Sequence, residues 1–492
     1  MSKDLSSYRQ IVKNTSILGG VQVIHIIVKI IQSKIIAVLL GPAGMGIISL
    51  LNSNLQFIGQ LTNFGLNTSA VKNVSEANGT GNSNRVAVIV SVLRRWVWIT
   101  GLLGTLFGII LSPWLSEFAF GNREYTMAFI WISISLLFNQ LSSGQIVLLQ
   151  GLRKIKYLAN ANLSGSFLGL FVSVPLYFIW GIDGIVPAII ATSLANLLRS
   201  WYFARKVNIE KVKVSRKSTF LEGKEMLTMG FMLSLSGLMT TGAGYLIYIY
   251  ISNTGGVDQV GLYSAGFAII NTYFGMIFSA MGTDYFPRLS EVAANNNRAR
   301  KTINQQAEVT LLIIAPILIL FMVFINWAII ILFSSKFIEI NEMIKWAALA
   351  MFFKASSWTM GFLLIAKGAS RLFFKKELAI SIITLGLNIA GYHYLKLDGL
   401  GISFLIAYVI NFIILLFMVN KNYEFRFEKA FRKIFLIQFI IGISSFLIMK
   451  FSTEPLSYVL GSSLIVISSI YSLVELNKRL DLRSRFARTR NS

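Results

Sequence analysis

Long apolar stretches, separated by short polar or glycine-containing breaks, follow one another along nearly the whole chain. A helix needs about 20 predominantly apolar residues to cross the hydrocarbon core of a bilayer. The pattern predicts fourteen such helices, at residues 14–40, 47–69, 96–117, 127–150, 159–180, 185–203, 226–251, 261–284, 307–333, 343–366, 378–395, 402–420, 433–449 and 457–474. The sequence therefore predicts an all-α integral membrane protein.

The composition agrees with this prediction and narrows the chemistry. Of the 492 residues, 55% are hydrophobic and 13% are charged, whereas soluble proteins carry about 25% charged residues. A soluble enzyme is therefore excluded. The chain has no cysteine and two histidines, His25 and His393, so we expect no disulfide, no metal site and no thiol catalysis. No cofactor is expected, and the absence of a phosphate-binding G-x-x-x-x-G-K-[ST] motif argues against ATP-driven transport.

The basic residues have a topological explanation. The chain has 45 Lys and Arg against 21 Asp and Glu, a net charge of +24. Most of these cations fall in alternate loops between the predicted helices, in the segment 204–225 and in the C-terminal tail. Cytoplasmic loops of membrane proteins carry such an excess of Lys and Arg. We therefore expect both termini in the cytoplasm and no nucleic-acid partner.

The chain resembles itself at an offset of 215 residues. The matches fall on equivalent breaks and helix ends, and include Gly41/Gly256, Gly46/Gly261, Ser49/Ser264, Thr68/Thr283, Ser75/Ser290 and Phe138/Phe353. An even number of helices per repeat predicts two lobes related by a pseudo-twofold axis along the membrane normal. The expected divisions are an N-terminal lobe of six helices at 1–210, a C-terminal lobe of six helices at 211–420, and two further helices with a basic tail at 421–492.

The first predicted helix carries a polar stripe at membrane depth. Gln22, His25, Lys29 and Gln32 lie within roughly 80° of one another at 100° per residue. A lysine near the centre of a bilayer costs about 2.5–3.5 kcal/mol on insertion scales, so this stripe must face protein or water. Lys29 either lines a cavity or is buried against carbonyl groups or a carboxylate. Lys34, further along, either extends to the outer interface or is functional.

Three further groups of polar residues point to a common cavity. Gln56 and Gln60 belong to a similar polar stripe in the second helix. The alternative interpretation of this stripe is that its amides form hydrogen bonds between helices. Lys354 lies near the middle of the tenth helix, either in a ligand site or as a structural charge, and Asn139 is its counterpart in the first repeat. We find no Asp or Glu near the middle of any predicted helix. The candidate substrate-binding residues are Gln22, His25, Lys29, Gln32, Gln56, Gln60, Asn139 and Lys354.

A cavity with lysines, amides and hydroxyls but no carboxylate suits an anionic, sugar-like ligand. Ammonium groups attract phosphates, and amides hydrogen-bond to sugar hydroxyls. A cationic drug would fit poorly, because exchange of drugs or protons relies on acids within the membrane.

Several segments resemble known transporters. The stretch 29–46, with Leu-Gly-Pro-Ala-Gly-Met-Gly at 40–46, resembles the opening of the Wzx-type O-antigen translocases. Residues 335–367, with Lys345, Trp346 and Lys354, resemble the corresponding region of the lipid III flippases. Residues 284–290 are similar to the cytoplasmic end of the eighth helix across the multidrug/oligosaccharidyl-lipid/polysaccharide exporter superfamily.

The resemblance implies a function at a bacterial inner membrane. Its members move an undecaprenyl-pyrophosphate-linked oligosaccharide, such as an O-antigen unit of lipopolysaccharide, from the cytoplasmic to the outer leaflet through a cavity between two six-helix lobes. The implied partners are this lipid-linked sugar, membrane lipids and the polysaccharide polymerase machinery. Lys354 matches a lysine of the family pattern, but Met351 stands where lipid III flippases tend to carry an acid. The helices at 433–474 would extend a groove for the lipid tail.

Two other functions compete with this one. A drug or cation antiporter would share the fold. A membrane polysaccharide polymerase or glycosyltransferase would need catalytic acids on a large external loop, whereas the predicted outer loops are short and their acids form no evident pair. We therefore expect a transporter rather than an enzyme.

Overall fold

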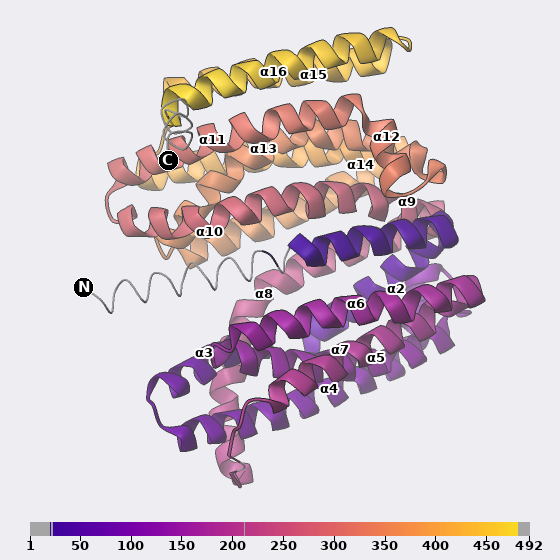
Figure 1. Ribbon diagram of the computed structural model, residues 1–492, viewed down its shortest axis with the longest axis vertical. Helices are drawn as coiled ribbons and strands as arrows, with labels where there is room; N and C mark the ends of the chain where they lie inside the picture. The colour runs from indigo at the N-terminus through magenta and orange to yellow at the C-terminus, as the bar shows by residue number, and fades with distance from the viewer. Residues whose placement is uncertain (1–19, 21–22, 211, 481–492) are drawn as a thin grey trace, which may run out of the picture. The chain divides into compact units, whose positions relative to one another are not determined.

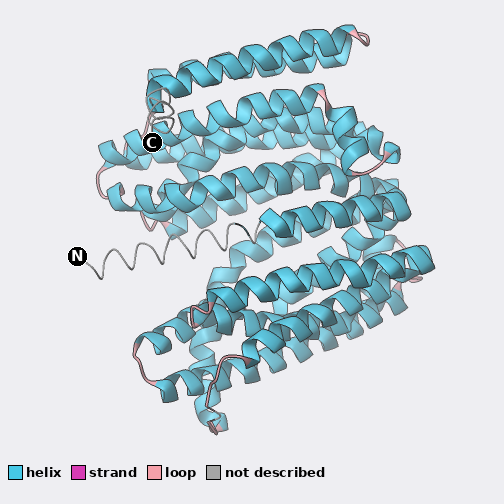
Figure 2. Cartoon of the chain, viewed as in Figure 1, coloured by secondary structure: helices cyan, strands magenta, loops and turns pink. Residues whose placement is uncertain are grey.

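The computed structural model describes residues 20, 23–210 and 212–480. The described residues are overwhelmingly helical and contain no strand (Figures 1 and 2). Nine helices among them are long and apolar enough to cross a membrane. Two of the nine, Ile155–Arg205 and Ser370–Tyr423, have 51 and 54 residues, enough for two crossings each. The all-α membrane fold is thus confirmed, and the count of fourteen crossings remains a prediction.

The contacts divide the chain into two units, which are described one at a time. The first unit comprises Met1–Ser264 with Leu332–Ser334, and the second comprises Ala265–Ile331 with Ser335–Ser492. The first unit contains a helix over 23–39 and then α2 (Gly41–Thr62), α3 (Leu66–Gly79), α4 (Ser83–Phe120), α5 (Thr126–Gly151), α6 (Ile155–Trp180), η1 (Gly181–Gly184), α7 (Ile185–Arg205), α8 (Arg216–Gly255) and the start of α9 (Val257–Ala268).

The second unit contains the remainder of the helices. They are the end of α9, η2 (Ile269–Tyr273), α10 (Phe274–Val292), α11 (Asn296–Val323), α12 (Ile325–Leu332), η3 (Ser335–Ile340), α13 (Asn341–Ala366), α14 (Ser370–Tyr423), α15 (Lys429–Phe451) and α16 (Leu456–Leu480).

One predicted helix ends earlier than expected. The stretch 47–69 was expected to be continuous, but α2 ends at Thr62 and α3 begins at Leu66. Phe64 and Gly65 between them have φ values of 49° and 66°, a left-handed geometry that an α-helix cannot include. A side chain at Gly65 would also collide with the backbone of Gly230 in α8. The break therefore lets two helices approach closely at a point that hydropathy cannot reveal.

A second predicted helix, at 307–333, is also interrupted. It divides into α11 and α12 at Phe324, whose φ of −102° and ψ of 26° depart from helical values. In contrast, the expected turn between the helices at 378–395 and 402–420 lies inside α14. Lys396 there has φ 51° and ψ −133°, and the Ser403 hydroxyl donates to the Leu387 carbonyl at 2.6 Å. The two legs of α14 therefore fold back on each other.

The helix α8 belongs to the first unit although it follows the predicted boundary at residue 210. The Asn54 amide donates to the Tyr245 hydroxyl at 2.8 Å, and Arg85 forms two hydrogen bonds of 2.5 and 3.0 Å with Glu222. The division by contacts thus falls at Ser264, whereas the expected divisions 1–210, 211–420 and 421–492 follow the sequence repeat and remain a prediction.

Within the first unit, α2 and α9 cross at two glycines. A methyl group on Gly46 would collide with the Val257 carbonyl, and one on Gly261 with the Pro42 carbonyl. Next to this crossing, the Ser49 hydroxyl donates to the Ser264 hydroxyl at 2.7 Å. The absence of side chains at both glycines lets the two backbones touch.

In the second unit, the last two helices are attached by buried polar contacts. The Gln438 amide on α15 donates to the Ser472 hydroxyl at 2.8 Å and accepts from the Ser468 hydroxyl at 2.7 Å. Arg479 on α16 forms an ion pair of 2.6 Å with Glu308 on α11. In a membrane, such hydrogen bonds hold helices together where hydrophobic burial does not.

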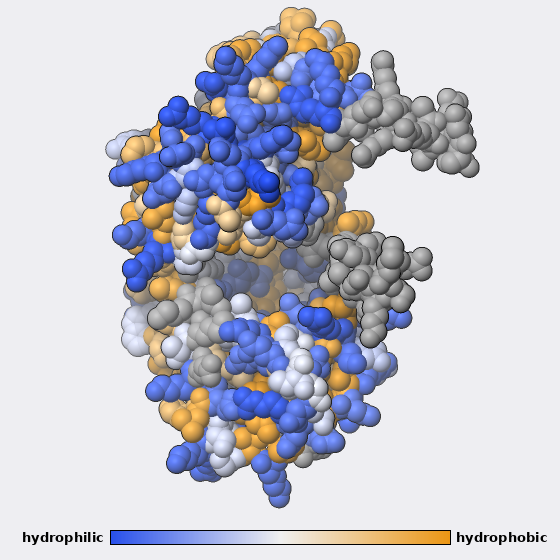
Figure 3. Space-filling view, turned by 90° about the vertical axis from the view of Figure 1, so that its left-hand side faces the viewer, coloured by the Kyte–Doolittle hydropathy of each residue, from blue (hydrophilic) through white to orange (hydrophobic). Residues whose placement is uncertain are grey.

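Hydrophilic side chains gather at one end of the helices. Figure 3 faces the left-hand side of Figure 1, where α3 turns into α4, and blue hydrophilic residues cover much of this face. The long sides of the helices carry many exposed apolar residues, such as Ile110 at 64% and Phe171 at 70%. This distribution fits helices that cross a bilayer with their polar ends in water.

Candidate functional site

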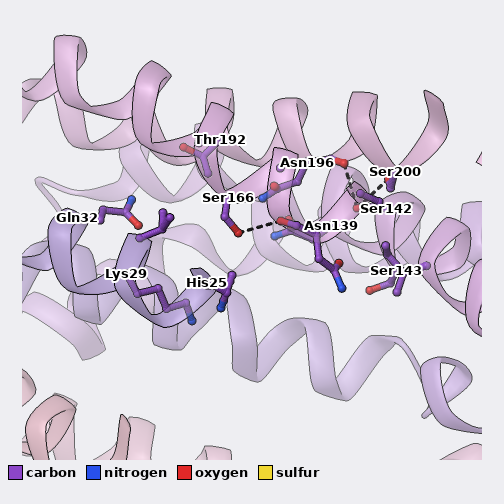
Figure 4. A pocket seen from close by; sticks show the side chains of 16 residues that line it. His25, Lys29, Gln32, Asn139, Ser142, Ser143, Ser166, Thr192, Asn196 and Ser200 are labelled. Atoms are coloured by element: carbon purple, nitrogen blue, oxygen red, sulfur yellow. Dashed lines mark hydrogen bonds between the residues drawn. The ribbon is translucent and has the colours of Figure 1, made fainter. Parts of the chain in front are cut away.

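A polar cavity of about 610 Å³ lies within the first unit (Figure 4). It lies among the helix over 23–39, α5, α6 and α7. In Figure 4, Lys29 and His25 lie across the cavity from Thr192 and Asn196. The polar lining residues are His25, Lys29, Gln32, Asn139, Ser142, Ser143, Asn162, Ser166, Thr192, Asn196 and Ser200.

A second cavity of about 660 Å³ adjoins the first. The two share five lining residues, Gln32, Asn139, Ser143, Thr192 and Asn196. The second cavity adds the polar face of α2, and its further polar lining residues are Asn52, Gln56, Gln60, Asn63, Asn67, Gln140, Tyr177, Ser193 and Thr241. Together the cavities form one polar region, which we call the amide cavity.

Helical periodicity explains how the sequence builds this region. Thr192, Asn196 and Ser200 are spaced by four residues on α7, so their side chains share one face. On α6, Gly165 and Gly169 stand opposite α7, and a methyl group on Gly169 would lie 2.9 Å from Thr192. These glycines bring α6 close to α7 and leave the polar side chains of α7 directed at the cavity.

Some polar groups of the amide cavity are already satisfied. The Ser142 hydroxyl donates to the Ser200 hydroxyl at 3.0 Å, and the Ser166 hydroxyl donates to the Asn162 carbonyl at 2.9 Å. The first bond joins α5 to α7 and the second lies within α6, and both hydroxyls therefore have less capacity left for a ligand.

Other groups have hydrogen-bonding capacity to spare. Among the described residues, no hydrogen-bond or ion-pair partner is found for the side chains of His25, Lys29, Gln32 or Asn139. The described residues that line the two cavities include no Asp or Glu. The charge of Lys29 is therefore not neutralised by a carboxylate within the amide cavity, and an anion could take that place.

Lys354 lies in the second unit and has different surroundings. It lines a separate pocket of about 370 Å³ whose walls include five aromatic side chains, those of Trp358, Phe362, Phe373, Phe404 and Tyr408. Its ammonium donates to the Asn271 amide oxygen at 3.2 Å and lies 5.3 Å from the centre of the Tyr408 ring. Lys354 is thus partly satisfied by protein groups, unlike Lys29.

This pocket of the second unit also has an acid, which the analysis of membrane-depth residues did not anticipate. Glu377 lines it and forms a 2.5 Å ion pair with Lys376, which is 8% exposed. Glu377 precedes the predicted helix 378–395 by one residue, so the prediction places it outside the membrane helices. The expectation of a cavity without carboxylates therefore describes the amide cavity and not the pocket around Lys354.

The structure brings together six of the eight candidate residues. His25, Lys29, Gln32, Gln56, Gln60 and Asn139 all line the amide cavity. Lys354 lines the pocket of the second unit, and Gln22 lies outside the described residues. Lys34 has a structural contact, since its ammonium donates to the Phe333 carbonyl at 2.5 Å.

The candidate residues predicted from the sequence include none from α7. Thr192, Asn196 and Ser200 were available to the same spacing argument that identified the stripes of the first two helices. The individual residues are common in membrane helices as links between neighbours, which is why their shared face was overlooked.

Solved structures of other proteins share this fold. The described fold is similar to the lipid II flippase MurJ in an inward closed conformation, with a TM-score of 0.70 and 12% identity over 95% of this chain and 99% of that one. It is also similar to an inward-facing multidrug resistance MATE family transporter, with a TM-score of 0.65 and 14% identity over 84% of this chain and 96% of that one. The fold is therefore one that multi-span membrane transporters adopt.

The sequence identifies the family. Residues 35–342 match the polysaccharide biosynthesis protein family, and residues 245–468 match the lipid II flippase MurJ family. The chain belongs to the polysaccharide biosynthesis protein family. Among individual relatives, the lipid III flippase of Escherichia coli K12 is 20% identical over 357 residues, which cover 71% of this chain and 84% of the relative.

Proposed function

We propose that the protein is a flippase for a lipid-linked oligosaccharide. The substrate is an undecaprenyl-pyrophosphate-linked sugar unit of O-antigen or a related surface polysaccharide, moved from the cytoplasmic to the outer leaflet. The observation that carries this proposal is the amide cavity, which combines an unneutralised lysine with many amides and hydroxyls and has no carboxylate among its described lining residues.

The cavity suits the two polar parts of such a substrate. Sugar hydroxyls both donate and accept hydrogen bonds, and amide side chains offer both functions at once. The ammonium of Lys29 suits a phosphate oxygen, because charge-assisted hydrogen bonds are roughly twice as strong as neutral ones. Transferring an isolated ion into hydrocarbon costs on the order of tens of kcal/mol, so the head group needs this polar path. The prenyl tail can remain in the lipid.

In this proposal the two lysines serve the pyrophosphate and the amides serve the sugar. Lys29 and Lys354 bind the phosphates, while Gln22, His25, Gln32, Gln56, Gln60 and Asn139 line the path of the sugar. Rocking of two lobes exposes the site to each side of the membrane in turn. An inside-negative potential favours the outward movement of the anion by about 2.3 kcal/mol per charge per 100 mV.

The proposal includes the location and the orientation of the protein. It lies in a bacterial inner membrane with both termini in the cytoplasm, and the polymerase that lengthens the polysaccharide receives its product. The Lys and Arg excess of alternate loops supports this orientation.

An antiporter for cationic drugs is the second candidate. The aromatic pocket of the second unit, with the carboxylate of Glu377, favours it. The ion pair between Glu377 and Lys376 counts against it, because the lysine already neutralises the acid that a cationic drug would need.

A flipping assay in liposomes tests the proposal. Purified protein is reconstituted with a fluorescent undecaprenyl-pyrophosphate oligosaccharide, and the fraction accessible to a membrane-impermeant reagent is followed with time. Parallel vesicles receive a cationic dye instead. We expect sugar-lipid movement by the wild type and slow movement by Lys29→Gln. Movement of the dye without movement of the sugar-lipid would reject the flippase in favour of the antiporter.

A further inference from the structure

The largest of the described cavities lies on the other side of α5 from the amide cavity. It is a groove of about 800 Å³ lined by α4, α5, α7 and residues 207–209 that follow α7, and these helices lie together in Figure 1. Phe138, Leu141 and Gln145 of α5 line this groove, whereas the neighbouring Asn139, Ser142 and Ser143 line the amide cavity. The helix α5 thus separates two chemically different spaces.

The walls of this groove are apolar and open to the surroundings. Leucines from three helices line it, and Trp98, Leu198 and Trp201 are 50%, 52% and 46% exposed. Apolar side chains exposed at membrane depth contact lipid. The two tryptophans lie near the predicted cytoplasmic ends of their helices, the level at which tryptophan is enriched in membrane proteins.

Two arginines, one from α4 and one from α7, are among the residues that line the groove. Arg94 lies about three turns into α4, and Arg205 is the last residue of α7. The Arg205 guanidinium stacks on the Trp201 ring at 4.5 Å from its centre. The described residues that line the groove include no Asp or Glu to neutralise either charge.

Arg94 does not share the hydrogen bonds that its neighbour Arg95 makes within the protein. Arg95 donates to the Val214 carbonyl at 2.7 Å and to the Thr219 hydroxyl at 2.6 Å, which fixes the connection between α7 and α8. For Arg94, no acceptor is found among the residues that the structure describes. The donors of one arginine are used within the protein, and those of the other are available to a ligand.

We propose that this groove binds an anionic phospholipid of the cytoplasmic leaflet. The lipid phosphate contacts Arg94 and Arg205, because guanidinium groups bind phosphate oxygens in a bidentate geometry. An acyl chain lies along Leu137, Leu141 and Leu197. The charge of the cytoplasmic leaflet is negative, which supplies the matching ligand at the predicted level of the two arginines.

The position of the groove gives the bound lipid a route to influence the protein. Val207, Asn208 and Ile209 line the groove and belong to the connection between α7 and α8. A lipid in the groove therefore contacts the segment that joins the two sequence repeats, and anionic lipid should stabilise that segment.

Native mass spectrometry of the full chain tests the proposal. Dioleoyl-phosphatidylglycerol and dioleoyl-phosphatidylcholine are titrated against the wild type, Arg94→Gln/Arg205→Gln and the control Arg216→Gln, an exposed arginine outside the groove. We expect the wild type and the control to prefer phosphatidylglycerol, and the double variant to bind it at least about tenfold more weakly. Equal binding of the two lipids by the wild type, or an undiminished preference in the double variant, would overturn the proposal.

Two further measurements complete the test. The first does not depend on the folding of the arginine variants, and the second distinguishes a phospholipid site from a substrate site. Phosphatidylglycerol with brominated acyl chains should quench tryptophan fluorescence of the wild type more than brominated phosphatidylcholine, and Trp98→Phe/Trp201→Phe should remove the difference. Undecaprenyl pyrophosphate is tested in the same titration. If it alone requires the two arginines and phosphatidylglycerol does not, the groove is a substrate site and the proposal is wrong.

Discussion

Ser49 donates a hydrogen bond of 2.7 Å to Ser264, a residue that follows it by 215 positions. This separation equals the offset at which the chain resembles itself, so each serine is hydrogen-bonded to its own counterpart. Gly46 and Gly261, a second matched pair, make the adjacent close crossing of α2 and α9. In a pair of repeats related by a twofold axis, residues that contact their own counterparts lie beside the axis. Two matched pairs of the sequence repeat therefore meet at one crossing within the first unit, and the pseudo-twofold relationship of the repeats remains a prediction.

Substituting one of these glycines should destabilise the protein. A methyl group in Gly261→Ala would collide with the Pro42 backbone, and such overpacking typically costs about 1–3 kcal/mol. Gly244→Ala in α8 is a matched control, because no atom lies within 4 Å of its added carbon. Thermal unfolding in detergent should show a lower melting temperature for the first variant only. Equal melting temperatures would mean that the helices can separate without cost.

The positions of the membrane helices could be predicted from the sequence, whereas some breaks within them could not. Apolar runs of sufficient length identified the membrane helices and the turn at Lys396, because burial in lipid imposes a strong constraint on composition. The break after Thr62 was missed because it depends on the left-handed backbone at Phe64 and Gly65, where α8 approaches. Hydropathy averages over such a site and carries no information about the distant partner.

The two lysines of the first helix should respond differently to substitution. Lys29→Gln removes an ammonium that has no partner among the described residues, so we expect normal melting and a flipping rate at least about tenfold lower. Lys34→Gln removes the bond to the Phe333 carbonyl, so stability should fall by about 1 kcal/mol. Flipping per folded molecule and the melting temperature are measured for both. Unchanged flipping by Lys29→Gln would exclude the proposed role of this lysine.

An asparagine from each cavity tests where the sugar binds. Asn196→Leu removes an amide from the amide cavity, whereas Asn411→Leu removes one from the pocket of the second unit. A hydrogen bond lost from a bound sugar weakens binding by roughly 0.5–1.5 kcal/mol. We expect a higher half-saturating substrate concentration for Asn196→Leu alone. A larger effect of Asn411→Leu would move the sugar to the aromatic pocket.

The candidate site was predicted in part, and the reason is again physical. Stripes on single helices, such as that of Lys29 and Gln32, follow from a spacing of three or four residues. The joining of these stripes with Asn196 of α7 depends on how the helices pack, which no spacing within one helix determines. The difference between Lys29 and Lys354 likewise arises from neighbours, since Asn271 contacts only the second.

An ion pair between a buried lysine and a partly exposed glutamate near the start of α13 should contribute to stability and not to transport. Lys345 is paired with Glu342 at 2.8 Å, and the two side chains are 5% and 33% exposed. Lys345→Met leaves the carboxylate without its counter-ion, which should cost about 1–3 kcal/mol. Lys336→Met, at an exposed lysine in η3, is the control. Unfolding experiments should distinguish the two, while the flipping rate per folded molecule stays unchanged.

The orientation can be tested because the chain has no cysteine of its own. Single cysteines at Lys213, which precedes α8, and at Thr254, in the last turn of α8, should react with an impermeant maleimide from opposite sides of the membrane. Lys213 is expected to be cytoplasmic, because it lies in the basic connection between the repeats. Labelling of both from the same side would contradict the predicted topology.

All described walls of the amide cavity belong to one contact unit. In a rocking cycle the amide cavity would move as one rigid unit, and the same side chains would surround the sugar before and after the movement. A ligand that binds two conformations equally well does not shift the balance between them. Binding of the sugar would then not favour either conformation. The direction of transport would have to come from the membrane potential, from an ion gradient or from removal of the product.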